Sequence, residues 1–224
     1  MPLAPHHGSH AMTRPFVPAA GHDLFLPLYD PLWRLMGGRD VRATFIRNAK
    51  LAAGQRVLDV GCGTGSLAVQ IAETVPGTIV HALDPDPKAL ARAGSKATRA
   101  QVSVAWKEGF GDALPYADES FERVTSSFMF HHLDRAVKQG MLREARRVLT
   151  RGGEFHLVDF GGHDAEHDHQ RGLLARLLHA KELLADQPGS GVVDLFEEAG
   201  FTNVARVSAA RSLFGHYAHI RGAA

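Results

Sequence analysis

Three glycines alternate with small residues in the segment VLDVGCGTG, residues 57–65. The segment opens as a short apolar strand, and the sequence after it, SLAVQIAETV, has helical spacing. A helix N-terminus presents unpaired amides, and glycine has no Cβ to hold a ligand away from the backbone. The spacing therefore predicts a strand–turn–helix unit in which Gly61, Gly63 and Gly65 bring backbone amides to a ligand.

Two acids accompany this turn. Asp59 stands two residues before the first glycine, and Asp84 ends the next apolar run, IVHALD. A carboxylate at the end of that second strand can accept hydrogen bonds from ribose hydroxyls. The ligand is a dinucleotide or S-adenosylmethionine. The G-x-G-x-G spacing differs from the G-x-G-x-x-G that a dinucleotide usually requires, and an acid beside the turn suits a cationic amino-acid ligand better than a pyrophosphate.

A second group of polar residues follows two later strands. His131 and His132 come after the run FERVTSS, and Asp159 stands near the end of EFHLVDF. Parallel strands end at one edge of a sheet, so we expect these three side chains to converge there as weak catalytic candidates. One histidine could be a general base. We favour a positioning role, because no acid lies beside the pair in sequence to orient an imidazole.

The elements that must hold these residues alternate between strand and helix. Strands are predicted at 56–60, 78–84, 102–106, 121–127 and 154–160, and the tail 201–222 reads as two more joined by a turn. Asp86-Pro87 and Asp134 are expected to begin helices, and the basic helix from Arg135 is expected to end at Gly152-Gly153. Such alternation predicts a doubly wound α/β fold with a largely parallel sheet.

The full pattern D-x-G-x-G-x-G resembles motif I of the class I S-adenosylmethionine-dependent methyltransferases. The similarity continues from Val57 to Ile220: Asp84-Pro85 resembles motif II, residues 124–133 resemble motif IV, and RVLTRGGEFHLVDFG resembles the segment after it. The branch with the most similar motifs includes the ubiquinone and menaquinone C-methyltransferases.

This resemblance implies a seven-stranded Rossmann-like sheet of order 3-2-1-4-5-7-6, with strand seven antiparallel and a helical extension before the first strand. It implies S-adenosylmethionine as cofactor and S-adenosylhomocysteine as product. Many relatives have an Asp where this sequence has Phe110, so here Phe110 would pack on the adenine. The residues expected to bind the cofactor are Asp59, Gly61, Cys62, Gly63, Gly65, Asp84, Pro85, Gly109, Phe110, Ser126 and Tyr29.

Composition excludes several other functions. Lys and Arg number 25 against 24 Asp and Glu, so no basic excess indicates nucleic-acid binding. No apolar run approaches the ~20 residues of a membrane helix, and a cytoplasmic protein is expected. One cysteine, Cys62, cannot build a disulfide or a cysteine zinc site. The acid- and histidine-rich segment 163–169 is expected to be a loop that caps a helix, so no metal site is predicted.

We expect residues 1–14 to be a tag-like or disordered N-terminus and 15–224 to be one methyltransferase domain, with a helical cap at 15–50 and a lid insertion at 161–190. The expected reaction is in-line methyl transfer to a small molecule, mainly by positioning. Two alternatives stay open: a nicotinamide-dependent oxidoreductase and a non-catalytic S-adenosylmethionine-binding protein. The oligomeric state is not predicted.

Overall fold

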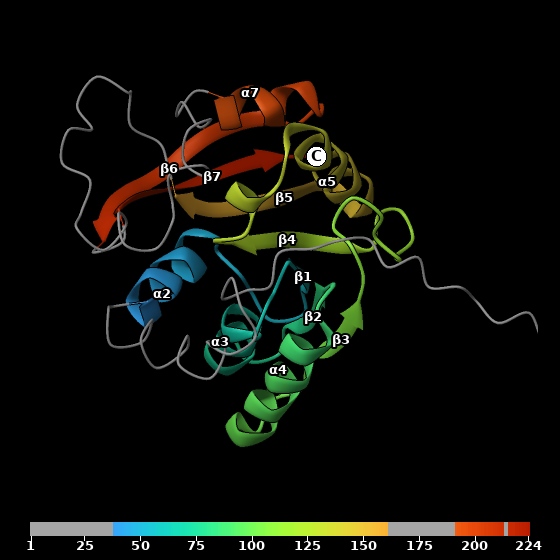
Figure 1. Cartoon of the computed structure of the whole chain (residues 1–224), viewed down its shortest axis with the longest axis vertical. Coiled ribbons are helices and arrows are strands. Elements are labelled where there is room, and N and C mark those ends of the chain that lie inside the picture. Colours follow the sequence, from blue (N-terminus) through green and yellow to red (C-terminus); the bar gives the residue numbers. More distant parts are fainter. Residues whose placement is uncertain (1–37, 161–190, 213–214) are drawn as a thin grey trace, which may run out of the picture.

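The computed structural model describes residues 38–160, 191–212 and 215–224 (Figure 1). The predicted N-terminal segment 1–14, most of the helical cap, the proposed lid 161–190 and the cofactor candidate Tyr29 lie outside these residues. The seven strands of the described chain are β1 (Arg56–Val60), β2 (Ile79–Asp84), β3 (Ala105–Glu108), β4 (Phe121–Ser127), β5 (Leu149–Phe160), β6 (Thr202–Ser212) and β7 (Gly215–Ala223).

The strand order is β3-β2-β1-β4-β5-β7-β6. Strands β1 to β5 pair in parallel, and β7 pairs antiparallel with both β5 and β6. The sequence-based prediction of the sheet, including the antiparallel seventh strand, is confirmed. Because β1 is an interior strand between β2 and β4, the glycine turn that follows it emerges at the carboxyl edge of the sheet, where the strand order reverses.

Helices cover both faces of this sheet (Figure 1). Successive residues of a strand point to opposite faces, and on β1 Val57 packs with α2 and α3 while Leu58 packs in the core that α5 and α7 cover. The helices are α2 (Gly38–Asn48), α3 (Ser66–Thr74), α4 (Pro87–Ala100), η2 (Phe130–His132, a 3₁₀ turn), α5 (Arg135–Val148) and α7 (Gly191–Glu198).

Two helix starts follow the predicted capping chemistry. The Asp86 side chain accepts a hydrogen bond from the Lys88 amide at 2.8 Å, with Pro87 in the first turn of α4. Asp134 likewise accepts from the Val137 amide at 2.9 Å at the start of α5. Each cap satisfies an amide that has no partner within the helix.

The end of α5 differs from the prediction. The helix stops at Val148, and β5 begins at once with Leu149, so the expected glycine cap does not form. Gly152 has φ 73° inside β5, and the pairing of β4 with β5 shifts register between Phe121 and Arg123. The two glycines therefore allow an irregular strand opening, a role that the helix-ending pattern of the sequence did not distinguish.

Candidate active site

The glycine turn folds back against the end of β2. The amides of Gly61 and Cys62 both donate to the Leu83 carbonyl, at 2.8 and 3.1 Å. Gly61 has φ 68°, and a Cβ there would overlap the Met129 side chain. The first glycine is thus required by its left-handed backbone, and it lets Met129, in the segment after β4, pack closely against the turn.

Asp84 fastens this turn to the second strand. One carboxylate oxygen, Oδ2, accepts from the Gly63 amide at 2.7 Å, and Oδ1 accepts from the Asp86 amide at 3.0 Å. The side chain is buried, and burial raises its pKa, although the two amide hydrogen bonds oppose that shift. Each carboxylate oxygen can accept a further hydrogen bond, so the group can still bind a pair of hydroxyls.

Asp59 lies fully buried on β1, beside β4. Its Oδ1 accepts from the Thr125 hydroxyl at 3.2 Å, while Oδ2 has no hydrogen-bond partner within the described part of the chain. Burial raises the pKa of Asp59 to about 7, the Thr125 hydrogen bond lowers it, and the charge of Asp84 raises it further. A buried carboxylate oxygen that lacks a partner is costly for the fold unless a donor or a cation satisfies it.

Ser126, on the neighbouring strand β4, also has a buried polar atom without a hydrogen-bond partner among the described residues. This β4 residue is fully buried, and its Oγ has no hydrogen-bond partner in the described structure. The two unpartnered buried oxygens, Asp59 Oδ2 and Ser126 Oγ, lie on opposite faces of the sheet, because Asp59 pairs in register with Thr125 and Ser126 is the next residue of β4. A ligand that carries a cationic amino group fits the unpartnered carboxylate oxygen of Asp59.

The other cofactor candidates lie along the same edge. Gly109 follows β3, and its amide donates to the Asp84 carbonyl at 3.2 Å. Phe110 and Pro85 are half-buried. The Cys62 thiol contacts the Gly63 carbonyl at 3.8 Å, and burial raises its pKa well above the ordinary value. The thiol is therefore protonated near neutral pH and is a poor nucleophile.

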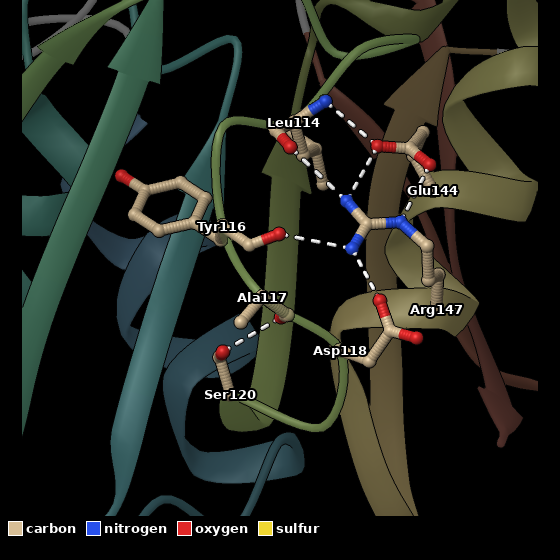
Figure 2. Close-up of polar contacts among 7 residues, drawn as sticks. All are labelled: Leu114, Tyr116, Ala117, Asp118, Ser120, Glu144 and Arg147. Carbon is tan, nitrogen blue, oxygen red and sulfur yellow. Dashed lines mark hydrogen bonds and ion pairs between the residues drawn. The ribbon is translucent and has the colours of Figure 1, made fainter.

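Arg147 fixes the loop that follows β3, a feature that the sequence interpretation missed (Figure 2). Its Nη1 donates to the Tyr116 carbonyl at 2.9 Å and to Asp118 Oδ1 at 2.6 Å, and Nη2 donates to the Leu114 carbonyl at 3.0 Å. Glu144, on the same helix, accepts from both Arg147 and the Leu114 amide. The sequence REARRVL places an acid, Glu144, three residues before Arg147, and this spacing could have predicted their ion pair on the helix.

The structure brings His131 and Asp159 into direct contact. His131 Nδ1 lies 2.5 Å from Asp159 Oδ1, and the His131 amide donates to Asp159 Oδ2 at 2.9 Å. The Phe160 amide also donates to the carboxylate, at 2.7 Å. The predicted convergence of these residues is observed. No acid lies beside the pair in sequence, but Asp159 contacts the His131 imidazole from β5.

His132 has a different environment although it is adjacent. Its ring centroid lies 3.9 Å from that of His131, and its Nδ1 is buried without a hydrogen-bond partner among the described residues. Burial, and then the neighbouring His131, lower the pKa of His132 to about 4, with Asp159 opposing the shift. His132 is therefore neutral near pH 7.

Neither a metal site nor a membrane span emerges from the parts of the chain that the structure describes. Within them, no group of three or more His, Cys, Asp or Glu residues is placed to bind a metal ion. None of the described helices is long and apolar enough to cross a bilayer. The polar segment 163–169 lies outside the described residues.

Comparison with known proteins agrees with this geometry. Residues 57–153 match a family model described as "Methyltransferase domain". A demethylmenaquinone methyltransferase of Deinococcus radiodurans is 37% identical over 137 residues, which cover 60% of this chain and 56% of that protein. A ubiquinone/menaquinone biosynthesis C-methyltransferase of Paracoccus denitrificans is 39% identical over 113 residues, covering 48% and 43%. The chain spans about half the length of these curated relatives.

A solved structure of a SAM-dependent methyltransferase from Aquifex aeolicus has the same fold, with a TM-score of 0.63, 18% identity, and coverage of 81% of this chain and 88% of that one. The matched segment 57–153 contains the glycine turn, Asp84, the loop after β3 and both histidines. The predicted resemblance is confirmed: residues 57–153 match the methyltransferase-domain model, the chain is similar to quinone C-methyltransferases, and its fold is that of the Aquifex aeolicus methyltransferase structure.

Proposed function

We propose that this protein transfers a methyl group from S-adenosylmethionine to a small-molecule acceptor. The observation that carries the proposal is the pairing of Asp84 with the Gly63 amide at 2.7 Å, which holds a carboxylate at the end of β2 directly across the glycine turn. When bound, S-adenosylmethionine supplies a methyl group activated by attachment to a positively charged sulfur.

The chain's own residues would bind the cofactor in three parts. Asp84 would accept hydrogen bonds from the two ribose hydroxyls. Asp59, whose Oδ2 lacks a partner among the described residues, would receive a donor from the amino-acid end, and Ser126 Oγ, on the opposite face of the sheet, is a further candidate. Phe110, in the first part of the loop after β3, would lie against the adenine. Pro85, Gly109 and the glycine turn would complete the contact surface, with Tyr29 as a further candidate.

Positioning accounts for most of the rate that such a site must supply. An activated methyl group needs an acceptor atom in line with the bond that breaks, and the exclusion of water. The described residues near the glycine turn are held by packing and by backbone hydrogen bonds, as Gly61 is against Met129. Residues that are held rigidly in this way keep a bound ligand in one geometry.

The acceptor class follows from the relatives and from charge. Relatives whose names specify quinone substrates match this chain over 137 and 113 residues, so we propose a small organic acceptor. The nearly balanced charge does not favour nucleic acid. We also propose a cytoplasmic location. A nicotinamide cofactor is disfavoured because the glycines of the turn have the spacing G-x-G-x-G, whereas a dinucleotide site usually has G-x-G-x-x-G.

Isothermal titration calorimetry tests this function directly. We expect S-adenosylmethionine and S-adenosylhomocysteine to bind and NADH to give no heat. The variant Asp84→Asn should weaken binding of both adenosyl ligands, whereas Glu73→Gln, which changes an exposed acid on α3, should not. Tight NADH binding with no response to either adenosyl ligand would refute the proposal. Binding without turnover on any acceptor would favour the non-catalytic alternative.

A further inference from the structure

Met129 packs directly against the glycine turn. It lies just after β4, which runs parallel to β1, so it stands at the edge of the sheet from which the turn emerges. The Cγ, Sδ and Cε atoms of Met129 are the three nearest neighbours that a Cβ on Gly61 would meet. The Gly61 amide in turn donates to the Leu83 carbonyl at 2.8 Å. The thioether of Met129 therefore borders the backbone to which we propose that the cofactor binds.

The surroundings of Met129 differ from those of the second described methionine. Met129 is partly exposed, with one side packed against the core that α5 covers. Met141, on α5, belongs to that core and has 0% of its surface exposed. The other methionines of the sequence lie outside the described residues. Of the two described thioethers, only that of Met129 belongs to a side chain that solvent reaches.

Exposure decides how readily a methionine is oxidised. Its sulfur carries lone pairs and no proton, so the reaction with a peroxide requires contact but no ionisation. The product, methionine sulfoxide, is polar and chiral, and it disrupts apolar contacts. Met129 therefore combines two properties at one atom: access to an oxidant and close packing against the glycine turn.

An oxygen on Sδ of Met129 would disturb the cofactor site in either direction. Turned toward the turn, it would meet Gly61, whose backbone has φ 68° and whose amide is held by Leu83. Turned away from the turn, it would project into the space beside Gly61, where the bound cofactor would lie. A polar group placed in an apolar contact without a hydrogen-bond partner costs free energy, so both arrangements would weaken binding.

We infer that Met129 is an oxidation site at which a peroxide reversibly weakens cofactor binding. The inference rests on the proposed function. In the step, a lone pair of Sδ attacks one peroxide oxygen, the oxygen–oxygen bond breaks, and with hydrogen peroxide the second oxygen leaves as water. The sulfur is oxidised by two electrons and the peroxide is reduced. A methionine sulfoxide reductase with two thiols reverses the change, giving the thioether, a disulfide and water.

Peptide mapping of the full chain tests the oxidation site itself. Tryptic peptides 124–135 and 139–143 contain one methionine each, Met129 and Met141. After treatment with hydrogen peroxide, mass spectrometry should show sulfoxide in peptide 124–135 before it appears in peptide 139–143. Saturating S-adenosylhomocysteine should slow the oxidation of peptide 124–135, because the bound cofactor would cover the sulfur.

Calorimetry with S-adenosylhomocysteine tests the effect on binding. Oxidised wild-type protein should bind at least about fivefold more weakly, and methionine sulfoxide reductases of both epimer specificities should restore the affinity. The variant Met129→Leu, which keeps the apolar volume, should bind normally before and after peroxide. The matched control Met141→Leu should lose affinity on oxidation, as the wild type does. Met129→Gln, with a polar chain of similar length, should bind weakly without peroxide.

Three results would overturn the role of Met129. Wild-type affinity with peptide 124–135 fully oxidised would refute the effect on binding. An equal loss of affinity in peroxide-treated Met129→Leu would place the sensitive group elsewhere, and oxidation that S-adenosylhomocysteine does not slow would place Met129 outside the cofactor site. The unoxidised protein keeps the two levels separate: if it fails to bind S-adenosylhomocysteine, the proposed function is refuted, whereas binding that is insensitive to oxidation of Met129 refutes only this inference.

Discussion

Nε of Arg147 lies 2.7 Å from Oε1 of Glu144, one helical turn earlier on α5. The pairing fixes the plane of the guanidinium, because Nη2 also donates to the second Glu144 oxygen at 2.8 Å. The remaining donors then point at the loop after β3, where they meet two backbone carbonyls (Figure 2). A helix on one face of the sheet thereby holds the part of this loop that leads into β4, at the amino edge of the sheet.

Replacing Arg147 by Lys should loosen this loop. Lysine keeps the charge but cannot donate in a fixed fork, and a hydrogen bond to a charged group is worth about 1.5–3 kcal/mol. Since the side chain is partly exposed, we expect a loss of about 1–2 kcal/mol of unfolding free energy. Hydrogen exchange should accelerate at residues 112–118. The control Arg143→Lys, at an exposed position of α5, should change neither quantity.

The substitution Asp84→Ala should weaken S-adenosylmethionine binding at least about tenfold, since 1.4 kcal/mol is a factor of ten and each hydrogen bond to the carboxylate contributes at least that much. It should also lower stability, because the Gly63 and Asp86 amides lose their acceptor. Calorimetry and urea unfolding measure the two effects. Unchanged affinity in a folded Asp84→Ala protein would show that the ribose binds elsewhere.

Asp59 should make cofactor binding depend on pH. Its pKa of about 7 means that the carboxyl is partly protonated at neutral pH. A cationic ligand favours the ionised form, so binding should release protons, and affinity should rise as pH increases from 6 to 8. Calorimetry in phosphate and in Tris, buffers with different ionisation enthalpies, detects this release. In Asp59→Asn the observed heat should no longer depend on the buffer.

A buried histidine pair should weaken the protein in mild acid. His156 Nδ1 lies 3.0 Å from His219 Nε2 on the neighbouring strands β5 and β7, and Phe45 packs on the His219 ring at 4.6 Å between centroids. Burial lowers the pKa of each to about 3. The unfolded chain therefore takes up protons near pH 6.5 that the folded chain does not.

Stability from these two residues is complete above about pH 6.5 and decreases as pH falls toward 4, by at most about 1.4 kcal/mol per pH unit for each histidine. Asp59 acts oppositely, because its raised pKa favours the folded state as pH falls. Urea unfolding at pH 7.5, 6 and 5 measures the sum. His219→Gln should reduce the slope, and Asp59→Asn should steepen it; an unchanged slope in both variants would contradict these assignments.

The sequence correctly predicted the features that depend on short local patterns of residues. The glycine turn, the strand ends at Val60 and Asp84, and the caps at Asp86 and Asp134 each depend on residues close together in the chain. Strand order followed from the family resemblance. The third strand is placed at 105–108, later than the predicted 102–106, since exposed Ala105 and Glu108 give it little hydrophobic signal.

The contacts between distant residues that shape the site could not be predicted from the sequence pattern. His131 and Asp159 are 28 residues apart and meet only because β4 and β5 end side by side. The hold of Arg147 on the Leu114 carbonyl, 33 residues away, needs α5 to lie against the loop. Neither residue type nor spacing separates His131 from His132; burial and a carboxylate from another strand do.

The protonated thiol of Cys62 has a consequence for how the cofactor site responds to oxidants. Thiolates, not thiols, react with peroxides and disulfides, and burial raises the pKa of this group well above its usual range. Cys62 is also the only cysteine of the sequence, so it has no second thiol within the chain with which to form a disulfide. A bulky oxidised sulfur beside Gly63 would disturb the amide that Asp84 accepts, and the high pKa protects the turn from that damage.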